Sequence, residues 1–200
     1  MFLSGSFQHT YSGHAEEARR QLFETEALAL FEDILENDLS LRVRVTGVSM
    51  MPFLKGGEIL TIKKEPHHVM RKGDLIFFKS SQGVPLLHRI IQKRMTPDEK
   101  ITFRTKGDGL IAFDEPVEYH RVLGKVSRIE KTNSVPGSKY INMESSQWRT
   151  INSIIARINL LKSYFNYSMF RFKSMIRFLA WDSSINSMIQ ENDHRSSKTK

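Results

Sequence analysis

The chain has 200 residues, a hydrophobic fraction of 40%, a charged fraction of 26% and a formal net charge of +8. These values are typical of a soluble globular protein that can bury a core. The absence of cysteine excludes disulfides, thiolate metal sites and cysteine nucleophiles. No stretch reaches the roughly 20 apolar residues of a membrane-spanning helix, and no signal peptide is evident. We therefore expect a cytoplasmic or peripheral membrane protein.

The charge is unevenly distributed along the chain. Residues 1–40 contain eight acidic and two basic side chains, whereas residues 139–200 contain ten basic and four acidic ones. A basic C-terminal region indicates an anionic partner, either membrane phosphate or nucleic acid. Nucleic acid is the weaker alternative, because no basic and aromatic pattern resembles a known nucleic-acid-binding module.

The first forty residues predict an acidic helical extension. Residues 1–14 are polar and carry no periodic pattern, but apolar residues then recur at helical spacing between residues 15 and 37. This helix either packs on the following domain or covers its active-site groove, and the sequence does not distinguish the two.

Residues 41–132 predict a mainly β domain. Six short segments rich in β-branched and aromatic residues are separated by Gly, Pro, Asp and Ser. They are LRVRVTGV, EILTIKK, DLIFFKS, PLLHRIIQKR, KITFRTKG and RVLGKVSRIEK. This spacing is typical of a compact antiparallel sheet or barrel.

The C-terminal third predicts a linker over residues 133–146, a basic amphipathic helix over 147–181 and a polar tail over 182–200. The apolar stripe of the helix comprises Ile151, Ile154, Ile155, Ile158, Leu161, Phe165, Phe172, Met175, Ile176 and Leu179. Such a helix packs on the β domain, lies on an anionic membrane or docks on a partner.

Three polar features of the β region supply the parts of a serine hydrolase. Ser49 lies in GVSMMP, His88 in PLLHRII, and Asp108 and Asp114 in TKGDGLIAFDEP. Each alone is ordinary turn or core chemistry. Together they provide a nucleophile, an imidazole that accepts its proton and a carboxylate that orients the imidazole.

The same segments resemble a known family. GVSMMPFLKGGEILTIKK resembles the Ser-Met-x-Pro box of the signal peptidase I and LexA-like serine peptidases (S24/S26-type), and RKGDLIFFKSSQGVPLLHRII resembles their next two boxes. TKGDGLIAFDEP and VLGKVSRI resemble the boxes that follow. The resemblance covers roughly residues 43–130. It implies a compact, barrel-like β domain with flanking helices, no metal or other cofactor, and an extended peptide or protein substrate such as a leader or signal-like segment.

The residues His88-Arg89-Ile90 resemble the branch of this family that uses a histidine base. This resemblance implies Ser49 as nucleophile, His88 as general base and Asp114 as the acid that orients it. Supporting roles fall to Asp108, which shapes its turn, and to three residues around the nucleophile, Gly47, Met50 and Pro52.

Two departures from the family leave alternatives open. Many signal peptidases have a serine two residues before the nucleophile, where this chain has Gly47, and the expected N-terminal membrane anchor is replaced by an acidic helix. The alternatives are a LexA-like self-cleaving regulator and a non-catalytic membrane-binding or partner-binding module on the same scaffold. The acidic first forty residues and His88 argue against the regulator, which needs DNA contact and a lysine base.

Overall fold

The computed structural model describes residues 25–131 and 140–197, and the side chains of residues 25–131 and 140–173. The chain divides into two compact units, Met1–Arg157 and Ile158–Lys200. The predictions for residues 1–24, for residue 132 at the end of the predicted β domain, for the first seven linker residues 133–139 and for residues 198–200 lie outside the described residues.

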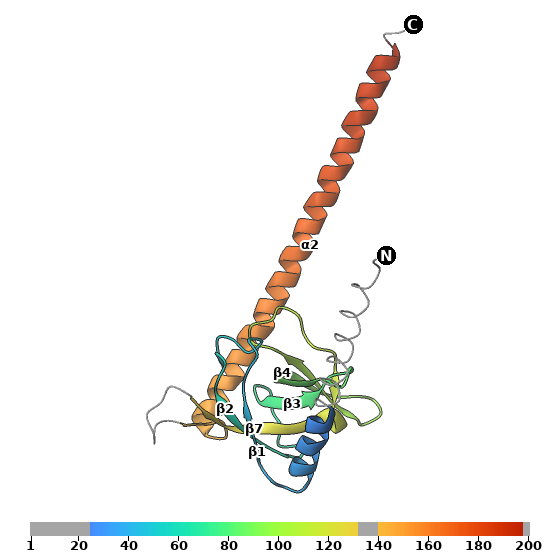
Figure 1. Ribbon diagram of the computed structural model, residues 1–200. Coiled ribbons are helices and arrows are strands. Elements are labelled where there is room, and N and C mark those ends of the chain that lie inside the picture. The colour runs from blue at the N-terminus through green and yellow to red at the C-terminus, as the bar shows by residue number, and fades with distance from the viewer. Residues whose placement is uncertain (1–24, 132–139, 198–200) are drawn as a thin grey trace, which may run out of the picture. The chain divides into compact units, whose positions relative to one another are not determined.

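One antiparallel sheet of eight strands dominates the first unit, and this confirms the mainly β prediction (Figure 1). The strand order is β1-β2-β7-β3-β4-β5-β6, with β8 paired to β7. The strands are β1 Leu41–Arg44, β2 Ile59–Lys63, β3 Leu75–Lys79, β4 Pro85–Met95, β5 Ile101–Lys106, β6 Val117–Glu118, β7 Val122–Glu130 and β8 Tyr140–Asn142, and a 3₁₀ turn, η1 Tyr119–Arg121, precedes β7.

The sheet is open, whereas the sequence led us to expect a barrel-like domain. Among the described strands, β1 and β6 stand at the two ends of the order and do not pair with each other. Strand β6 makes only two residue pairs with β5, Thr102 with Glu118 and Phe103 with Val117. Each of the six predicted segments contains a strand, and the short strands β6 and β8 are additional.

Strand β3 separates two hydrophobic cores. Its residues Leu75 and Phe77 belong to one cluster with β1, β2 and the N-terminal helix, whereas Ile76 and Phe78 belong to another with β4, β5 and β6. Successive side chains of a strand point to opposite faces, so a strand that is covered on both sides is apolar throughout. This explains the uninterrupted apolar run Leu-Ile-Phe-Phe in β3.

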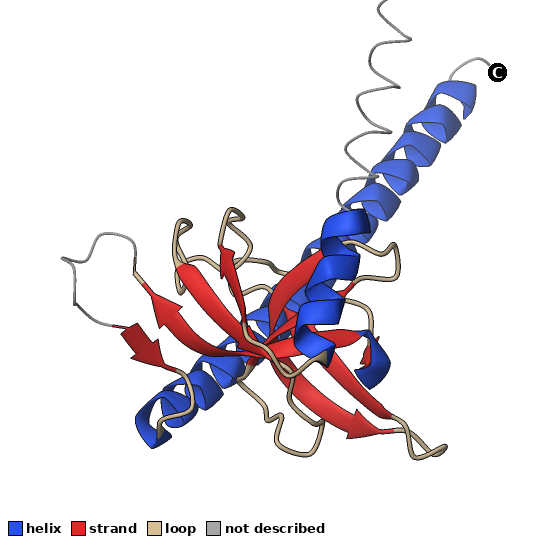
Figure 2. Cartoon of the chain, turned by 60° about the horizontal axis from the view of Figure 1, so that its bottom comes forward, coloured by secondary structure: helices blue, strands red, loops and turns tan. Residues whose placement is uncertain are grey.

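The N-terminal helix, described over residues 25–36, packs against one face of the sheet (Figure 2). Leu28 and Leu35 are buried in the first core cluster. The Phe31 ring lies 6.1 Å from that of Phe77 on β3. Glu32 forms an ion pair with Lys79 at the end of the same strand.

Helix α2 runs from Ser146 to Ser197 and is longer than predicted. Ser145 caps its start by accepting a hydrogen bond from the Trp148 N–H at 3.4 Å. The sequence has no glycine or proline after residue 137 to break α2, and the helix continues through residues 182–197, where we predicted a polar tail. In the described part of the chain, no helix combines the length and apolar character that crossing a membrane requires.

The apolar stripe predicted for this helix faces solvent in its first turns. Ile151 and Ile154 are 40% and 49% exposed, whereas Asn152 and Ala156 are buried. The helix therefore contacts the β domain through Trp148, whose ring lies 6.2 Å from that of Phe53, and through the small and polar residues Asn152 and Ala156. At Asn152 the helix backbone approaches Gly73 closely.

Candidate active site

Ser49 lies in a tight turn that follows β1. The turn is closed by two backbone hydrogen bonds, from Met51 N–H to the Val48 carbonyl at 3.0 Å and from Leu54 N–H to the Met50 carbonyl at 3.0 Å. The Met50 side chain is buried in the core, while Ser49 is half-buried. The peptide bond before Pro52 is cis. A buried methionine thus anchors the turn, and the neighbouring serine is left at the surface of the domain.

His88 lies on β4, opposite Ile76 of β3, and is only 4% exposed. Its Nε2 atom is 3.2 Å from the Ser49 Oγ. Its ring is tilted against that of Phe78, with the centroids 6.2 Å apart. Strand β4, packed beside β3, therefore holds the imidazole in a fixed position next to Ser49, although the two residues are 39 positions apart in the sequence.

Asp114 completes a hydrogen-bonded chain with His88 and Ser49. Its Oδ2 atom lies 2.7 Å from His88 Nδ1 and also accepts a hydrogen bond of 2.7 Å from the Thr105 hydroxyl. The Asp114 N–H donates to the Thr105 carbonyl at 3.0 Å, which fixes the loop to β5. Burial by itself would raise the pKa of Asp114, but the hydrogen bonds from His88 and Thr105 and the charge on His88 lower it below its usual value.

Two glycines let the loop that carries Asp114 approach the serine turn. A Cβ atom on Gly107 would lie 2.6 Å from the Ser49 carbonyl oxygen, and one on Gly109 would lie 3.0 Å from the Met51 carbonyl oxygen. The Gly109 N–H donates a 2.9 Å hydrogen bond to the Ser49 carbonyl. The segment TKGDG therefore contacts the Ser49 turn directly, which a larger residue at position 107 would prevent.

Asp108 is paired with Arg89, the residue that follows the histidine. Its carboxylate accepts two hydrogen bonds from the Arg89 guanidinium, 2.8 Å from Nε and 2.7 Å from Nη2. Both side chains are almost fully buried, and the guanidinium also stacks on the Phe53 ring, 4.6 Å from its centroid. Arg89 follows His88 directly, so this buried ion pair fixes β4, which carries the imidazole, to the loop after β5.

A pocket of about 330 Å³ opens beside Ser49. Most of its lining is apolar and comes from β1, β2, β3, β4 and the N-terminal helix. The lining residues are Phe31, Val43, Arg44, Val45, Thr46, Gly47, Ser49, Met50, Leu60, Ile62, Phe77, Pro85, Leu86 and Leu87. The N-terminal helix thus both packs on the domain and, through Phe31, forms one wall of this pocket.

The structure brings together Ser49, His88 and Asp114, and it places the other predicted residues around them. Gly47 lines the pocket, and a Cβ atom at this position would meet no atom within 4 Å. Sequence reasoning missed two contributors, Thr105 and Phe31. Thr105 begins the TKGD segment, which could have indicated it. The sequence allowed the helix that contains Phe31 to cover the groove, but it did not single out Phe31 as a lining residue. No group of three or more potential metal-ligating side chains occurs among the described residues.

Comparisons with known proteins do not identify a family or a function for this site. No protein-family model matches the chain, and no curated protein is significantly similar to it.

Proposed function

We propose that the protein is a serine endopeptidase of the signal-peptidase-like type, which cleaves an extended peptide with Ser49, His88 and Asp114. The observation that carries this proposal is the continuous chain of contacts from Ser49 Oγ to His88 Nε2 at 3.2 Å and from His88 Nδ1 to Asp114 Oδ2 at 2.7 Å. The finer fold assignment, a signal-peptidase or LexA-like catalytic domain, belongs to the same proposal.

The contacts support a role for each side chain. In the neutral tautomer with the proton on Nδ1, His88 donates to Asp114 and leaves Nε2 free to accept the proton of the Ser49 hydroxyl as Oγ attacks a peptide carbonyl. Nε2 then returns this proton to the amine as the peptide C–N bond breaks, which leaves the acyl group on Ser49. A water molecule that gives a proton to Nε2 attacks this ester, and the proton returns to Ser49 Oγ as the acid product leaves. Asp114 stays ionised, because its pKa is lowered, and it stabilises the imidazolium that forms.

The developing oxyanion needs hydrogen-bond donors near Ser49. Within the part of the chain that the structure describes, no acceptor takes a hydrogen bond from the Ser49 backbone N–H. This N–H is therefore available for the oxyanion. Gly47 contributes no hydroxyl, so backbone groups carry this role.

The substrate-binding region is formed by strand β1 and the apolar pocket. Strand β1 pairs only with β2 among the described strands, so its other edge is available for an extended peptide. Val43, Val45 and Gly47 continue from this edge to the serine along the pocket. A peptide that adds to β1 would place a side chain in the pocket on the acyl side of the cut, and the resemblance implies that this side chain is small.

Cleavage of a peptide library with small residues at alternating positions tests the proposal, with products identified by mass spectrometry. The wild-type protein should cleave a subset of the library. Ser49→Ala should abolish cleavage without changing the unfolding midpoint, because it removes one half-buried oxygen atom. Ser40→Ala, at an exposed serine outside the site, is the matched control and should cleave normally.

The pH dependence of cleavage identifies the base. A histidine base gives activity that rises around pH 6–7, whereas a lysine base gives activity that rises only above about pH 8. Retained cleavage by Ser49→Ala would contradict the proposal. A folded wild-type protein that cleaves no member of the library would instead favour a non-catalytic binding module.

A further inference from the structure

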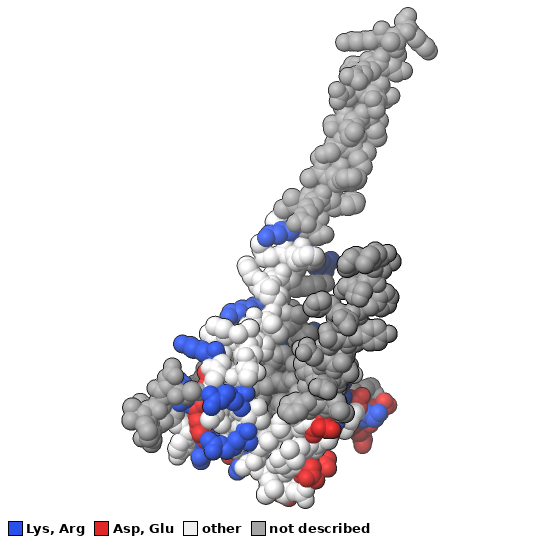
Figure 3. Space-filling view, in the orientation of Figure 1, with Lys and Arg blue, Asp and Glu red and all other residues white. Residues whose placement is uncertain are grey.

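A second pocket lies between the turn before β3 and the first turns of α2. It has a volume of about 450 Å³ and shares no lining residue with the pocket beside Ser49. Its lining residues are Arg71, Lys72, Asp74, Arg149, Thr150, Ser153, Ile154 and Arg157. Figure 3 shows basic side chains gathered beside the first turns of α2, and four of the eight lining residues are basic.

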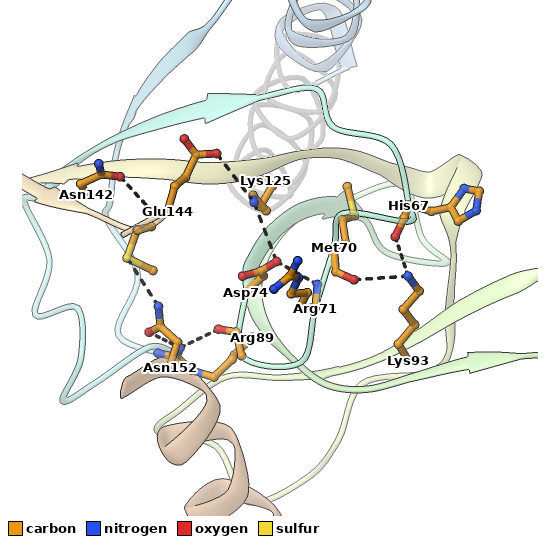
Figure 4. A network of polar contacts seen from close by, with 12 residues as sticks. His67, Met70, Arg71, Asp74, Arg89, Lys93, Lys125, Asn142, Glu144 and Asn152 are labelled. Carbon is orange, nitrogen blue, oxygen red and sulfur yellow. Dashed lines mark hydrogen bonds and ion pairs between the residues drawn. The ribbon is translucent and has the colours of Figure 1, made fainter. Parts of the chain in front are cut away.

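The two walls of this pocket are fixed to each other by buried contacts. Gly73 has a φ angle of +99°, and a Cβ atom on it would lie 2.6 Å from the Asn152 backbone. Arg89 Nη1 donates to both the Gly73 carbonyl and the Asn152 Oδ1, at 2.8 Å each. Figure 4 shows Arg89 and Asn152 joined in this network. A ligand would therefore enter a pocket that is already formed, so little ordering would oppose its binding.

The pocket carries an excess of positive charge. The one carboxylate in its lining, Asp74, lies 3.9 Å from Lys125 Nζ, which is outside the pocket lining and also approaches Glu144 at 3.8 Å. Among the described residues, none of the side chains of Arg71, Lys72, Arg149 and Arg157 forms an ion pair. Four cations in one concavity attract an anion.

The arrangement of donors fits a phosphate group. Arg149, Ser153 and Arg157 follow one another at four-residue spacing and so line one face of the helix. Guanidinium groups bind phosphate oxygens in pairs, and the Thr150 and Ser153 hydroxyls add further donors to the same pocket.

Apolar side chains next to these cations distinguish a lipid from a soluble phosphate. Ile154 lines the pocket and is 49% exposed, and Ile151, one turn earlier, is 40% exposed. A soluble phosphate compound would leave both isoleucines in water. A phospholipid surface would cover them with the apolar layer beneath its headgroups.

We propose that Arg71, Lys72, Arg149 and Arg157 bind the phosphate headgroup of an anionic phospholipid, with Ile151 and Ile154 at the boundary of the acyl chains. The sequence suggested a membrane contact along residues 147–181. This site differs from that suggestion because half of its cations come from the turn before β3, outside the helix. The site does not depend on peptidase activity.

Vesicle sedimentation of the full-length protein tests this site. Vesicles contain phosphatidylcholine alone or phosphatidylcholine mixed with phosphatidylglycerol. The variant R149Q/R157Q removes two cations of the pocket, and K63Q/K100Q removes two exposed cations outside it. Both double variants have the same net charge, and thermal unfolding establishes that each is folded.

The wild-type protein should bind the mixed vesicles and bind phosphatidylcholine alone much more weakly. R149Q/R157Q should reduce the partition coefficient by roughly thirtyfold, the loss expected for two basic side chains at an anionic surface, while K63Q/K100Q should reduce it far less. If both variants lose the same fraction of vesicle binding, the net charge of the protein explains the binding and the proposed site is overturned. Equal binding to both vesicle types would also overturn it.

Inorganic phosphate distinguishes a soluble ligand from a lipid. If phosphate shifts the NMR resonances of Arg149 and Arg157 while the mixed vesicles do not bind, the pocket takes a soluble phosphate compound and the lipid proposal is overturned. Vesicle binding that R149Q/R157Q weakens selectively supports the lipid.

Discussion

The buried ion pair between Arg89 and Asp108 joins the strand that carries His88 to the loop that carries Asp114. The guanidinium and the carboxylate make two hydrogen bonds of 2.8 and 2.7 Å, and both side chains are excluded from solvent. Arg89 also bonds Gly73 and Asn152. One residue therefore connects β4, the loop after β5, the turn before β3 and helix α2, next to the proposed general base.

Asp108→Asn should destabilise the fold. It leaves the Arg89 guanidinium buried without a compensating charge, which typically costs about 3–5 kcal/mol. Urea unfolding at neutral pH measures the change in free energy of unfolding. The matched control is Asp98→Asn, at an exposed aspartate in the turn between β4 and β5, which should change stability very little. Similar small effects in both variants would show that the pair does not hold the site together.

Asp114 and Asp74 should show opposite pH dependences. Hydrogen bonds from His88 and Thr105 and the charge on His88 overcome the effect of burial and lower the pKa of Asp114. Its ionised form therefore stabilises the fold fully above about pH 4, the unfolded value, and this contribution is lost as pH falls through the folded pKa. For Asp74, burial outweighs the Arg71 N–H and nearby cations and raises the pKa, so stability declines as pH rises through that pKa.

Urea unfolding of Asp114→Asn and Asp74→Asn between pH 2 and pH 7, relative to the wild type, measures both effects. The stability advantage of the wild type over Asp114→Asn should shrink as the pH falls through the acidic range. The stability of the wild type relative to Asp74→Asn should instead increase as the pH falls over the same range. If the two variants show the same change in stability with pH, the opposite pKa shifts of Asp114 and Asp74 are wrong.

Phe31→Ala should change substrate selection. Phe31 supplies the wall that the N-terminal helix contributes to the pocket beside Ser49, so its removal enlarges the pocket and should raise kcat/KM for peptides with larger side chains on the acyl side. Leu35→Ala is the control, because Leu35 is fully buried in the same helix and does not line the pocket. It should cost about 2–5 kcal/mol of stability and leave the size preference unchanged. An unaltered preference in Phe31→Ala would exclude the pocket as the binding site for that side chain.

Gly47→Ser should raise kcat. A Cβ atom at position 47 would meet no atom within 4 Å, so the fold should tolerate the change. A hydroxyl two residues before the proposed nucleophile Ser49 would add a donor for the proposed oxyanion. We expect a gain of about tenfold, below the full effect of an optimised oxyanion donor. Gly47→Ala adds the same Cβ atom without the hydroxyl and should leave kcat unchanged. An equal effect of both substitutions would argue against an oxyanion next to residue 47.

Local sequence patterns predicted the strands well, because alternation and turn residues act over a few neighbouring positions. They did not predict whether the sheet closes, since that depends on pairing between β1 and β6, which are far apart in the chain. Helical periodicity correctly grouped Ile151 and Ile154 on α2. It could not tell that the domain would contact Asn152 and Ala156 instead, because a period shows which residues share a face and not what that face meets.

The candidate site was predictable only in part, for a similar reason. Ser49, His88 and Asp114 stand in segments that resemble boxes of one family, and the structure places them within hydrogen-bond reach across 39 and 26 positions of sequence. Thr105, Arg89 and Phe31 act through contacts across the fold. Their roles follow from the antiparallel pairing of β4 with β5 and from the packing of the N-terminal helix on β3.

Covalent labelling by a fluorophosphonate probe tests most directly whether Ser49 is an activated nucleophile. Intact-mass spectrometry of the labelled full-length protein, followed by peptide mapping, measures both stoichiometry and position. We predict one adduct, located on Ser49, that is lost in Ser49→Ala and strongly slowed in His88→Ala. No adduct on the folded wild-type protein, or an adduct at another serine that persists in Ser49→Ala, would contradict the proposed mechanism.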